Sequence, residues 1–305
     1  MIKEIKNGEI TWLNIVGPNK DTTRFLREKY DIAPSILKEF IPPIKRPKVE
    51  DYRGYLFVVI HFPVFDKKTK KTSSVELDII LFKNILVTSH CNSFPELRRI
   101  FNHCQEDKAI RDYYLENDAV FSLYRILDKL IDTRMPMLDH IDDHIDEIEK
   151  RIFDGDEKKL LKEIAFVKHD IIGFRKAMKP QRTVLESLAR SSCKIAGKDY
   201  PRETKEVIGS NIKVWNTLEN HKEMIEALEQ TNESLFSHKL NDTMRVLTAF
   251  SVMVLPLSLI ANAFGMNVIG GMPLLQNTFG FWIIIIMMLS VTLISFLFFK
   301  YKKWI

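Results

Sequence analysis

The chain has 305 residues, of which 46% are hydrophobic and 28% charged, and its formal net charge is +5. These totals fit one large or two ordinary globular domains, and so small a net charge gives no reason to expect a nucleic-acid partner. The 3 cysteines lie far apart in the sequence, which argues against a disulfide scaffold or a zinc ribbon and is typical of a reducing compartment. The N-terminal residues lack the apolar core of a secretory signal, so we expect the polar part of the chain to lie in the cytosol.

The first hundred residues predict a mixed α/β domain. Apolar runs that alternate or are rich in β-formers predict strands at Thr11–Val16, Tyr55–Phe62, Leu77–Phe82 and Ile85–Ser89. Apolar residues at helical spacing predict short helices between them, including Thr22–Tyr30 and Phe94–Cys104. The densest basic run is expected to be a solvated hairpin turn rather than a binding surface, and it consists of Lys67, Lys68, Lys70 and Lys71.

Long helices are predicted after about residue 118. Ala119–Phe153 has apolar residues at three- and four-residue steps and is expected to form one helix. A second helix is expected from Glu157 to about Ala196, with Pro180 as a candidate kink. A third begins near Arg202 and meets no Gly-Pro break before the apolar region. If it continues into that region, about 60 residues would give a rod of about 90 Å, which must pack against neighbours.

One of these predicted helices carries two histidines among many acids. His140 and His144 are one helical turn apart within the segment 138–150, and this spacing is able to bind zinc. A long helix more often has such a face because it is exposed to water, and we favour that interpretation.

The C-terminal part of the chain contains no charged residue from Val246 to Phe299. A helix needs about 20 mostly apolar residues to cross the hydrocarbon core of a bilayer. Val246–Phe264 and Phe281–Phe299 each supply such a stretch, and a loop rich in Gly, Pro and Asn lies between them. The sequence therefore predicts a transmembrane helical hairpin.

Basic residues at both ends of the hairpin predict its orientation. Lys239 and Arg245 precede the first span, and Lys300, Lys302 and Lys303 follow the second. Because basic flanks favour the cytoplasmic side, we expect both termini in the cytosol and the loop outside.

A narrow line of small or polar residues runs along the first span at heptad-like steps. Its members are Asn241, Met244, Thr248, Ser251, Leu255, Ser258 and Asn262. Two interpretations stay open at this point. The hydroxyls bond to carbonyls of their own helix and help neighbouring helices pack, or the line faces water in a pore. Two spans cannot enclose a pore, so the second interpretation requires a ring of subunits.

Gly265-Met266-Asn267 ends the first predicted span. Gly265 is able to act simply as a helix-terminating glycine, with Asn267 as the start of a loop. Alternatively, Asn267 amides from several subunits form a neutral, oxygen-rich ring at the outer mouth. Magnesium gives up its water reluctantly, so such a ring suits the hydrated ion.

An ordered series of motifs resembles the CorA family of divalent-cation transport proteins over nearly the whole chain. Gly265-Met266-Asn267 is similar to the family signature, and Met272-Pro273, the second span and the basic tail 300–305 follow in family order. Upstream, Lys45–Glu50 and Tyr55–Val58 resemble the family's soluble domain.

The resemblance implies an α/β cytosolic domain, long stalk helices and a C-terminal two-helix transmembrane hairpin, assembled as a cyclic homopentamer around a central pore. It also implies that Gly265, Met266 and Asn267 form the selectivity filter. By the same resemblance the pore is lined by Asn241, Met244, Leu247, Leu255 and Ser258, with Met244 and Leu247 as an apolar gate. Thr248 and Ser251 join this set from the polar line described above.

The resemblance further implies a brake on ion entry. Family members bind regulatory magnesium at acidic positions between neighbouring cytosolic domains, and matching positions are Asp66 and Glu206. A solvated pair of surface carboxylates is the competing interpretation.

Three departures from the family pattern bear on ion choice. Phe264 stands where the family usually has Tyr, and Leu274 stands where many members have an acid after Met-Pro. The run Gly270–Pro273 is similar to that of the zinc-transporting branch. Magnesium is the expected ion, with cobalt, nickel and zinc as alternatives, and no organic cofactor is expected.

These observations predict magnesium uptake through the plasma (inner) membrane, driven by membrane potential and gated by intracellular magnesium. A zinc, cobalt or nickel transporter of the same family is the alternative, and a membrane-anchored scaffold or enzyme is the alternative outside transport. The expected divisions of the chain are 1–117 (α/β domain), 118–240 (long helices with the stalk), 241–264 (pore helix), 265–280 (external loop), 281–299 (second transmembrane helix) and 300–305 (basic tail).

Overall fold

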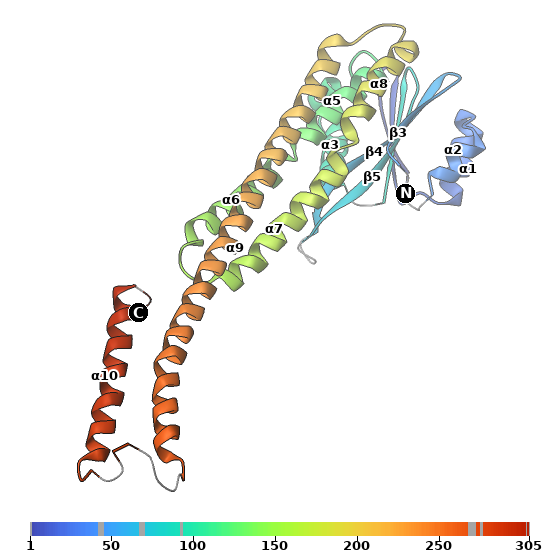
Figure 1. Ribbon diagram of the computed structural model, residues 1–305. Helices are drawn as coiled ribbons and strands as arrows, with labels where there is room; N and C mark the ends of the chain where they lie inside the picture. Colours follow the sequence, from blue (N-terminus) through green and yellow to red (C-terminus); the bar gives the residue numbers. More distant parts are fainter. Residues whose placement is uncertain are drawn as a thin grey trace. The chain divides into compact units, whose positions relative to one another are not determined.

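The chain forms two compact units, Met1–Glu229 and Gln230–Ile305. The computed structural model describes residues 2–41, 46–66, 71–91, 94–267, 273–274, 277–302 and 304 (Figure 1). The first unit contains the strands and the helices α1 to α8. Helix α9 (Pro201–Gly265) begins in the first unit and ends in the second, which also contains α10 (Gly280–Tyr301).

A six-stranded mixed sheet with the order β1-β2-β6-β5-β4-β3 organises the first unit. Its strands are β1 (Ile2–Asn7), β2 (Ile10–Val16), β3 (Lys48–Tyr52), β4 (Tyr55–Asp66), β5 (Lys71–Leu81) and β6 (Ile85–His90). β2 and β6 pair in parallel and the other neighbours are antiparallel. The four strands predicted from the sequence are β2, β4, β5 and β6, which lie in the middle of the sheet.

The two strands that the sequence pattern missed, β1 and β3, are the edges of this sheet. Both carry several charged residues, IKEIKN in β1 and KVEDY in β3. Charged side chains on edge strands discourage pairing with other chains. The same charges interrupt the apolar alternation by which a strand is recognised.

The sheet is covered on both faces, as the continuous burial of β4 from Tyr55 to Ile60 requires. Successive residues of a strand point to opposite faces. Phe57 and Val59 join a core beneath α1 (Lys20–Tyr30) and α2 (Pro34–Glu39), whereas Val58 and Ile60 join a larger core. The larger core includes buried residues of α3 (Pro95–Glu106), α5 (Ala119–Asp132), α6 (Met135–Arg151), α7 (Glu157–Met178) and α8 (Gln181–Ala196), while α4 (Lys108–Tyr114) packs against α3 and α5.

The prediction of a single helix over Ala119–Phe153 was wrong. The chain forms α5 and α6 instead, because Pro136 in the first turn of α6 has no N–H and its ring would clash with the carbonyl four residues earlier. Arg134 fills the break and is 1% exposed. Its Nη1 donates to the Pro63 carbonyl at 2.9 Å, and its Nη2 lies 3.2 Å from Glu96 Oε2.

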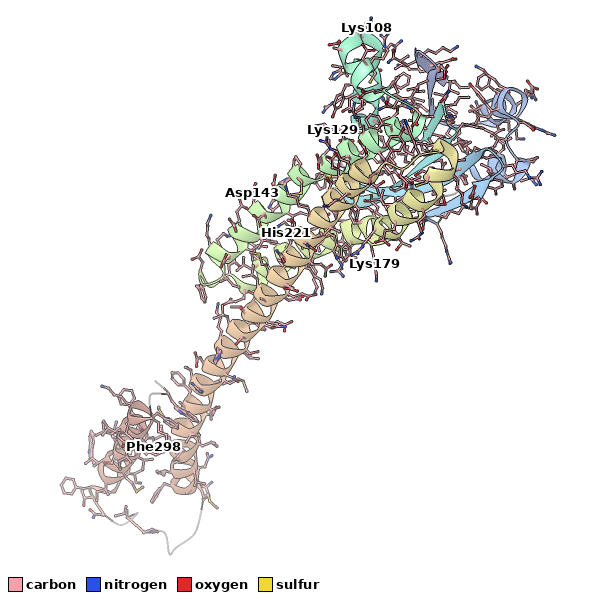
Figure 2. The ribbon with its side chains drawn as sticks, turned by 90° about the horizontal axis from the view of Figure 1, so that it is seen from above. Lys108, Lys129, Asp143, Lys179, His221 and Phe298 are labelled. Atoms are coloured by element: carbon pink, nitrogen blue, oxygen red, sulfur yellow. The ribbon has the colours of Figure 1, made fainter. Side chains whose placement is uncertain are left out.

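The second predicted helix is two helices, α7 and α8, and Pro180, expected to kink one helix, lies at the break between them. Gly197, at φ 72°, ends α8, as the sequence also predicted. The first part of α9 then packs beside α6 and α7 within this unit. His221 Nε2 lies 3.1 Å from Asp142 Oδ1 of α6, at the position labelled in Figure 2. Arg175 of α7 pairs with Glu219 at 2.6 Å.

The second unit contains two helices that are long and apolar enough to cross a membrane. They are the last part of α9 and the whole of α10, so the third predicted helix does continue into the first apolar stretch. Almost none of either apolar stretch is buried within the chain. Their side chains therefore require lipid or other copies of the protein as a surrounding.

α7 approaches the start of β5 unusually closely at Gly173. A Cβ atom added to Gly173 would lie 2.3 Å from the Thr72 carbonyl oxygen. The Thr72 N–H donates to Asp170 Oδ1 at 2.9 Å, so the contact is also held by a hydrogen bond. A side chain at position 173 must therefore push the helix away from the sheet.

We predict that Gly173→Ala destabilises the first unit by about 1–3 kcal/mol, the usual cost of overpacking. Gly209→Ala is the matched control, because Gly209 is also helical and nothing lies within 4 Å of its added Cβ. That change should leave stability unchanged or raise it by about 0.5–1 kcal/mol. Thermal unfolding of the detergent-purified chain, followed by circular dichroism, measures both; equal melting temperatures for the two variants would contradict the prediction.

Candidate functional site

The residues predicted to line a pore form one exposed face of α9. All seven are exposed in the chain, and at about 100° per residue they fall within a sector of about 120° around the helix. They are Asn241, Met244, Leu247, Thr248, Ser251, Leu255 and Ser258. The face combines small polar groups with three large apolar side chains.

Two of the hydroxyls on this face are satisfied by their own helix. Thr248 Oγ1 donates to the Met244 carbonyl at 2.7 Å, and Ser251 Oγ donates to the Leu247 carbonyl at 3.0 Å. A hydroxyl bonded in this way tolerates either lipid or water. These two residues therefore do not by themselves distinguish a pore-lining face from a packing face.

The three residues of the predicted filter lie together where α9 ends. Gly265 is its last residue, and Met266 and Asn267 follow directly, both exposed. Helix C-termini have carbonyls without intrahelical partners and carry partial negative charge. The end of α9 thus presents carbonyl oxygens and an amide, an electron-rich but uncharged set that suits a cation.

The described part of the following loop folds back against the start of α10. The Asn277 side chain accepts a hydrogen bond from the Phe279 N–H at 3.0 Å. Gly280 lies so close to the Leu274 carbonyl that an added Cβ would be 2.3 Å from it. Residues 268–272, which include Met272 of the predicted Met-Pro motif, lie outside the described part of the chain.

The predicted basic residues lie at the C-terminal end of α10. Lys300 lies in its last turn and Lys302 caps it, with Nζ 5.8 Å from the centre of the Phe298 ring. Lys303 lies outside the described residues.

The two predicted regulatory acids lie on different elements of the first unit. Asp66 is exposed at the end of β4, and β5, its partner strand, begins against α7. Glu206 is in the second turn of α9 and faces α5. Its Oε1 pairs at 3.0 Å with Nε of Arg202, one turn earlier on α9. The fold therefore does not gather the pair into one single-chain site.

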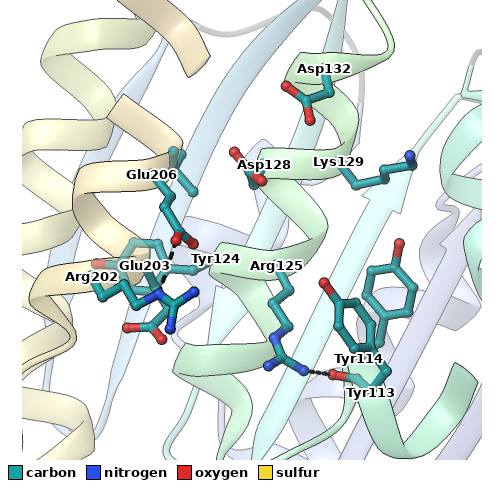
Figure 3. Close-up of a pocket in the computed structure, with 11 residues that line it drawn as sticks. Tyr113, Tyr114, Tyr124, Arg125, Asp128, Lys129, Asp132, Arg202, Glu203 and Glu206 are labelled. Carbon is teal, nitrogen blue, oxygen red and sulfur yellow. Dashed lines mark hydrogen bonds and ion pairs between the residues drawn. The ribbon is translucent and has the colours of Figure 1, made fainter. Parts of the chain in front are cut away.

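Glu206 borders a charged pocket of about 390 Å³ between α5 and the start of α9 (Figure 3). Four acids and three bases line it together with tyrosines. The charged lining residues are Arg125, Asp128, Lys129, Asp132, Arg202, Glu203 and Glu206.

Asp128 is one of three acids in this pocket that the sequence analysis missed, and the other two are Asp132 and Glu203. Burial raises the pKa of Asp128 above the ordinary value, and the negative charges of Asp132 and Glu206 add to that effect, while a hydrogen bond from Ser210 at 2.8 Å opposes it. Negative charge is thus crowded where α5 meets α9. The spacing of Asp128 and Asp132, one turn apart on α5, was visible in the sequence, but their approach to Glu206 depends on the fold.

The two histidines on α6 do share a surface. Their rings stack with centroids 4.6 Å apart, and His144 Nδ1 lies 3.9 Å from Glu147. Among the described residues, no three His, Cys, Asp or Glu side chains are placed to hold a metal ion. The interpretation of this segment as an exposed helix face stands as the simpler one.

Comparison with known proteins identifies the family. The profile of CorA-like Mg²⁺ transporter proteins matches residues 7–302. The cobalt/magnesium transport protein CorA of Thermotoga maritima is 29% identical over 297 residues, covering 97% of this chain and 83% of the relative. The zinc transport protein ZntB of Yersinia enterocolitica is 20% identical over 301 residues, covering 96% of this chain and 88% of that protein.

A solved structure has the same fold. The CorA magnesium transporter of Methanocaldococcus jannaschii superposes with a TM-score of 0.84 at 21% identity, covering 99% of this chain and 93% of that one. The predicted fold class, an α/β domain with long helices and a C-terminal pair of apolar helices, is confirmed.

The pKa of Asp128 leads to a testable dependence of stability on pH. Folding raises the pKa of Asp128 above its ordinary value of 3.8, so the protonated carboxyl favours the folded state. This contribution to stability is fully present below pH 3.8 and is lost as the pH rises through the raised pKa of the folded state. Asp128→Asn should therefore raise the melting temperature at pH 7, and the gain should shrink as pH falls toward 4. Asp143→Asn, on the exposed face of α6, is the control and should show no such trend; a gain for Asp128→Asn that is constant with pH would contradict the assignment.

Proposed function

We propose that this chain, which belongs to the CorA-like Mg²⁺ transporter family, forms a channel for magnesium uptake. Family membership makes it a divalent-cation transporter and not an enzyme. The observation that carries the magnesium proposal is the uncharged hairpin whose polar helix face ends in Gly265-Met266-Asn267. Charged ligands that would strip an ion of its water do not occur from Val246 to Phe299.

The channel requires several copies of the chain. Two helices cannot surround an aqueous path, and nearly all of their apolar surface is unburied within one chain. A closed ring of copies, each contributing α9, provides an enclosed path and covers part of that surface. We propose a homopentamer in the plasma (inner) membrane with both termini in the cytosol, because basic residues flank both ends of the hairpin.

Selection at the filter is proposed to act on the hydrated ion. A ring of Asn267 amides offers neutral oxygens that accept hydrogen bonds from water bound to the ion. Magnesium is smaller than calcium and dehydrates reluctantly, so a site that leaves its water in place lowers the barrier to entry. The C-terminal carbonyls of the surrounding α9 helices add negative potential without a fixed charge.

The membrane potential is a sufficient driving force. An inside-negative potential contributes about 2.3 kcal/mol per charge per 100 mV, hence about 4.6 kcal/mol for a divalent ion. Since 1.4 kcal/mol is a factor of ten, accumulation beyond about a thousandfold is available without ATP. A path with this driving force needs a means of closing.

We propose that intracellular magnesium closes it by bridging neighbouring subunits. Asp66 at the end of β4 and the acids around Glu206 lie on different elements, as donors to a shared site between two copies would. Asp128 belongs with them, because it lines the same pocket as Glu206, and because burial, with the negative charges of Asp132 and Glu206, raises its pKa. A bound dication would favour the charged form of this carboxyl. Loss of the ion would then leave like charges facing one another and favour separation of the subunits.

Zinc is the alternative ion, and a specific observation favours it. The run Gly270–Pro273 is similar to that of the zinc-transporting branch, and a zinc transport protein is among the relatives that match nearly the whole chain. Reconstituted vesicles offered magnesium, zinc and cobalt separately distinguish the two proposals by the order of the uptake rates.

Asn267→Ala should lower magnesium uptake by about tenfold or more, since removal of the amide ring takes away the groups that hold the hydrated ion. Thr278→Ala, a change in the same loop, is the control and should transport normally. Uptake into vesicles at a fixed potential measures both. Normal magnesium uptake by Asn267→Ala would remove the filter from the proposal.

The double variant Asp66→Ala, Glu206→Ala should need a higher internal magnesium concentration for inhibition, because two carboxylates that bind the regulatory ion are lost. Asp128→Ala should shift inhibition in the same direction. Asp143→Ala removes a carboxylate from the exposed face of α6 and serves as the control. Inhibition curves that coincide for all variants would exclude these acids from regulation.

A further inference from the structure

Asn262 is the only amide side chain in the apolar part of α9, from Val246 to Gly265. It lies four residues after Ser258, one helical turn further along the same face, and three residues before the end of the helix. The side chain is exposed in the chain. Its position is therefore on the polar face of α9, close to the proposed filter.

The bonding of Asn262 differs from that of Thr248 and Ser251, the earlier polar residues of this face within the apolar part of α9. Thr248 and Ser251 each donate to a carbonyl of their own helix. Within the part of the chain that the structure describes, neither Ser258 nor Asn262 makes a side-chain hydrogen bond. Within the apolar part of α9, the polar groups of this face nearest the filter are thus the ones without a side-chain hydrogen bond in the described structure. An amide has two N–H donors and an acceptor oxygen to satisfy.

The second helix of the hairpin does not supply the missing partners. Ser290 and Thr292 of α10 donate to the carbonyls of Ile286 and Met288, at 2.8 and 2.9 Å. Trp282, near the start of α10, is 62% exposed and no hydrogen bond joins it to Asn262 in the described structure. An unpaired amide in hydrocarbon is strongly unfavourable, so Asn262 must face water or another copy of the chain.

We propose that Asn262 lines the ion path and forms a second ring of amides inside the ring of Asn267, which binds a hydrated divalent cation through its water. This inference rests on the proposed channel and deepens it. The distance along the helix axis from Asn262 to the end of α9 at Gly265 is about 4.5 Å. Ser258 lies about 6 Å from Asn262 in the opposite direction, toward the cytosol. Asn267, Asn262 and Ser258 then form successive neutral stations along one face.

Successive weak sites have a clear use in conduction. An ion must bind well enough to enter yet leave easily, and several neighbouring sites allow an incoming ion to displace the one ahead. Neutral amides bind a dication more weakly than carboxylates would, so the ion is able to leave the second ring and move to the next site. Its ligand class is the hydrated dication, the same class as at Asn267.

Cysteine accessibility tests the placement directly. Asn262→Cys is compared with Ile260→Cys, which lies about 200° around the helix, on the opposite side. A membrane-impermeant, positively charged thiol reagent is applied from outside to the reconstituted full-length protein, and labelling is measured as a mass shift. The native cysteines Cys91, Cys104 and Cys193 all lie in the first unit, and the wild type treated in the same way gives their background.

The expected result is labelling of Asn262→Cys, with a fall in magnesium flux of about tenfold after labelling, and no labelling of Ile260→Cys. An unlabelled Asn262→Cys, or equal labelling of the two variants, would overturn the inference. Labelling is measured independently of flux. If wild-type vesicles take up no dication, the proposed function is excluded, whereas the mass shift of Asn262→Cys still shows whether position 262 faces water.

A second variant keeps the inference testable if the cysteine variant does not assemble. Asn262→Asp places a ring of carboxylates at the same level and should lower the magnesium concentration for half-maximal uptake by about tenfold, with slower maximal flux, because the ion binds more tightly. Ile260→Asp points away from the path and should not produce this pair of changes. Unchanged uptake kinetics for Asn262→Asp would overturn the proposal.

Discussion

The absence of water from the hydrocarbon core is the constraint on which this protein depends. Every polar group of the two apolar stretches, Val246–Phe264 and Phe281–Phe299, must find a partner there or face an enclosed aqueous space. α10 meets most of the constraint alone, because its Ser290 and Thr292 hydroxyls bond to its own carbonyls, although in the described structure its Ser295 makes no side-chain hydrogen bond. α9 meets it only in part, and its unsatisfied groups gather toward the Gly265 end. A single hairpin is therefore an incomplete structure, and assembly around a shared path is its natural completion.

The first unit has a different part in the proposed mechanism, which is to place acidic side chains where an intracellular cation is able to bind them. A doubly covered sheet fixes β4 and β5, and the buried Arg134 holds the turn between α5 and α6 against the Pro63 carbonyl. That framework positions Asp128 in one pocket with Glu206, where burial raises the pKa of Asp128 and the negative charges of Asp132 and Glu206 add to the effect. The proposed regulation by a dication would use this carboxyl together with its acidic neighbours.

The sequence predicted the parts of this structure that local pattern determines. The central strands, the breaks at Pro180 and Gly197 and the two apolar helices follow from alternation, backbone chemistry and hydropathy. The edge strands β1 and β3 were missed because their charges hide the alternation, and the break at Pro136 was missed because helical spacing continues across it. Asp128 was missed for another reason: its proximity to Glu206 joins residues of α5 and α9 that only the tertiary fold brings together. Gly265-Met266-Asn267 was recognisable in the sequence as a candidate filter, whereas the ring proposed for it would be a property of several chains.

The most direct test of this account is magnesium uptake by the purified chain in sealed vesicles, measured with and without an imposed inside-negative potential of about 100 mV, which is worth about 4.6 kcal/mol to a divalent ion. The account predicts electrogenic accumulation above the external concentration, and its collapse when the potential is removed. Vesicles that remain impermeable to magnesium, zinc and cobalt at every potential would contradict it.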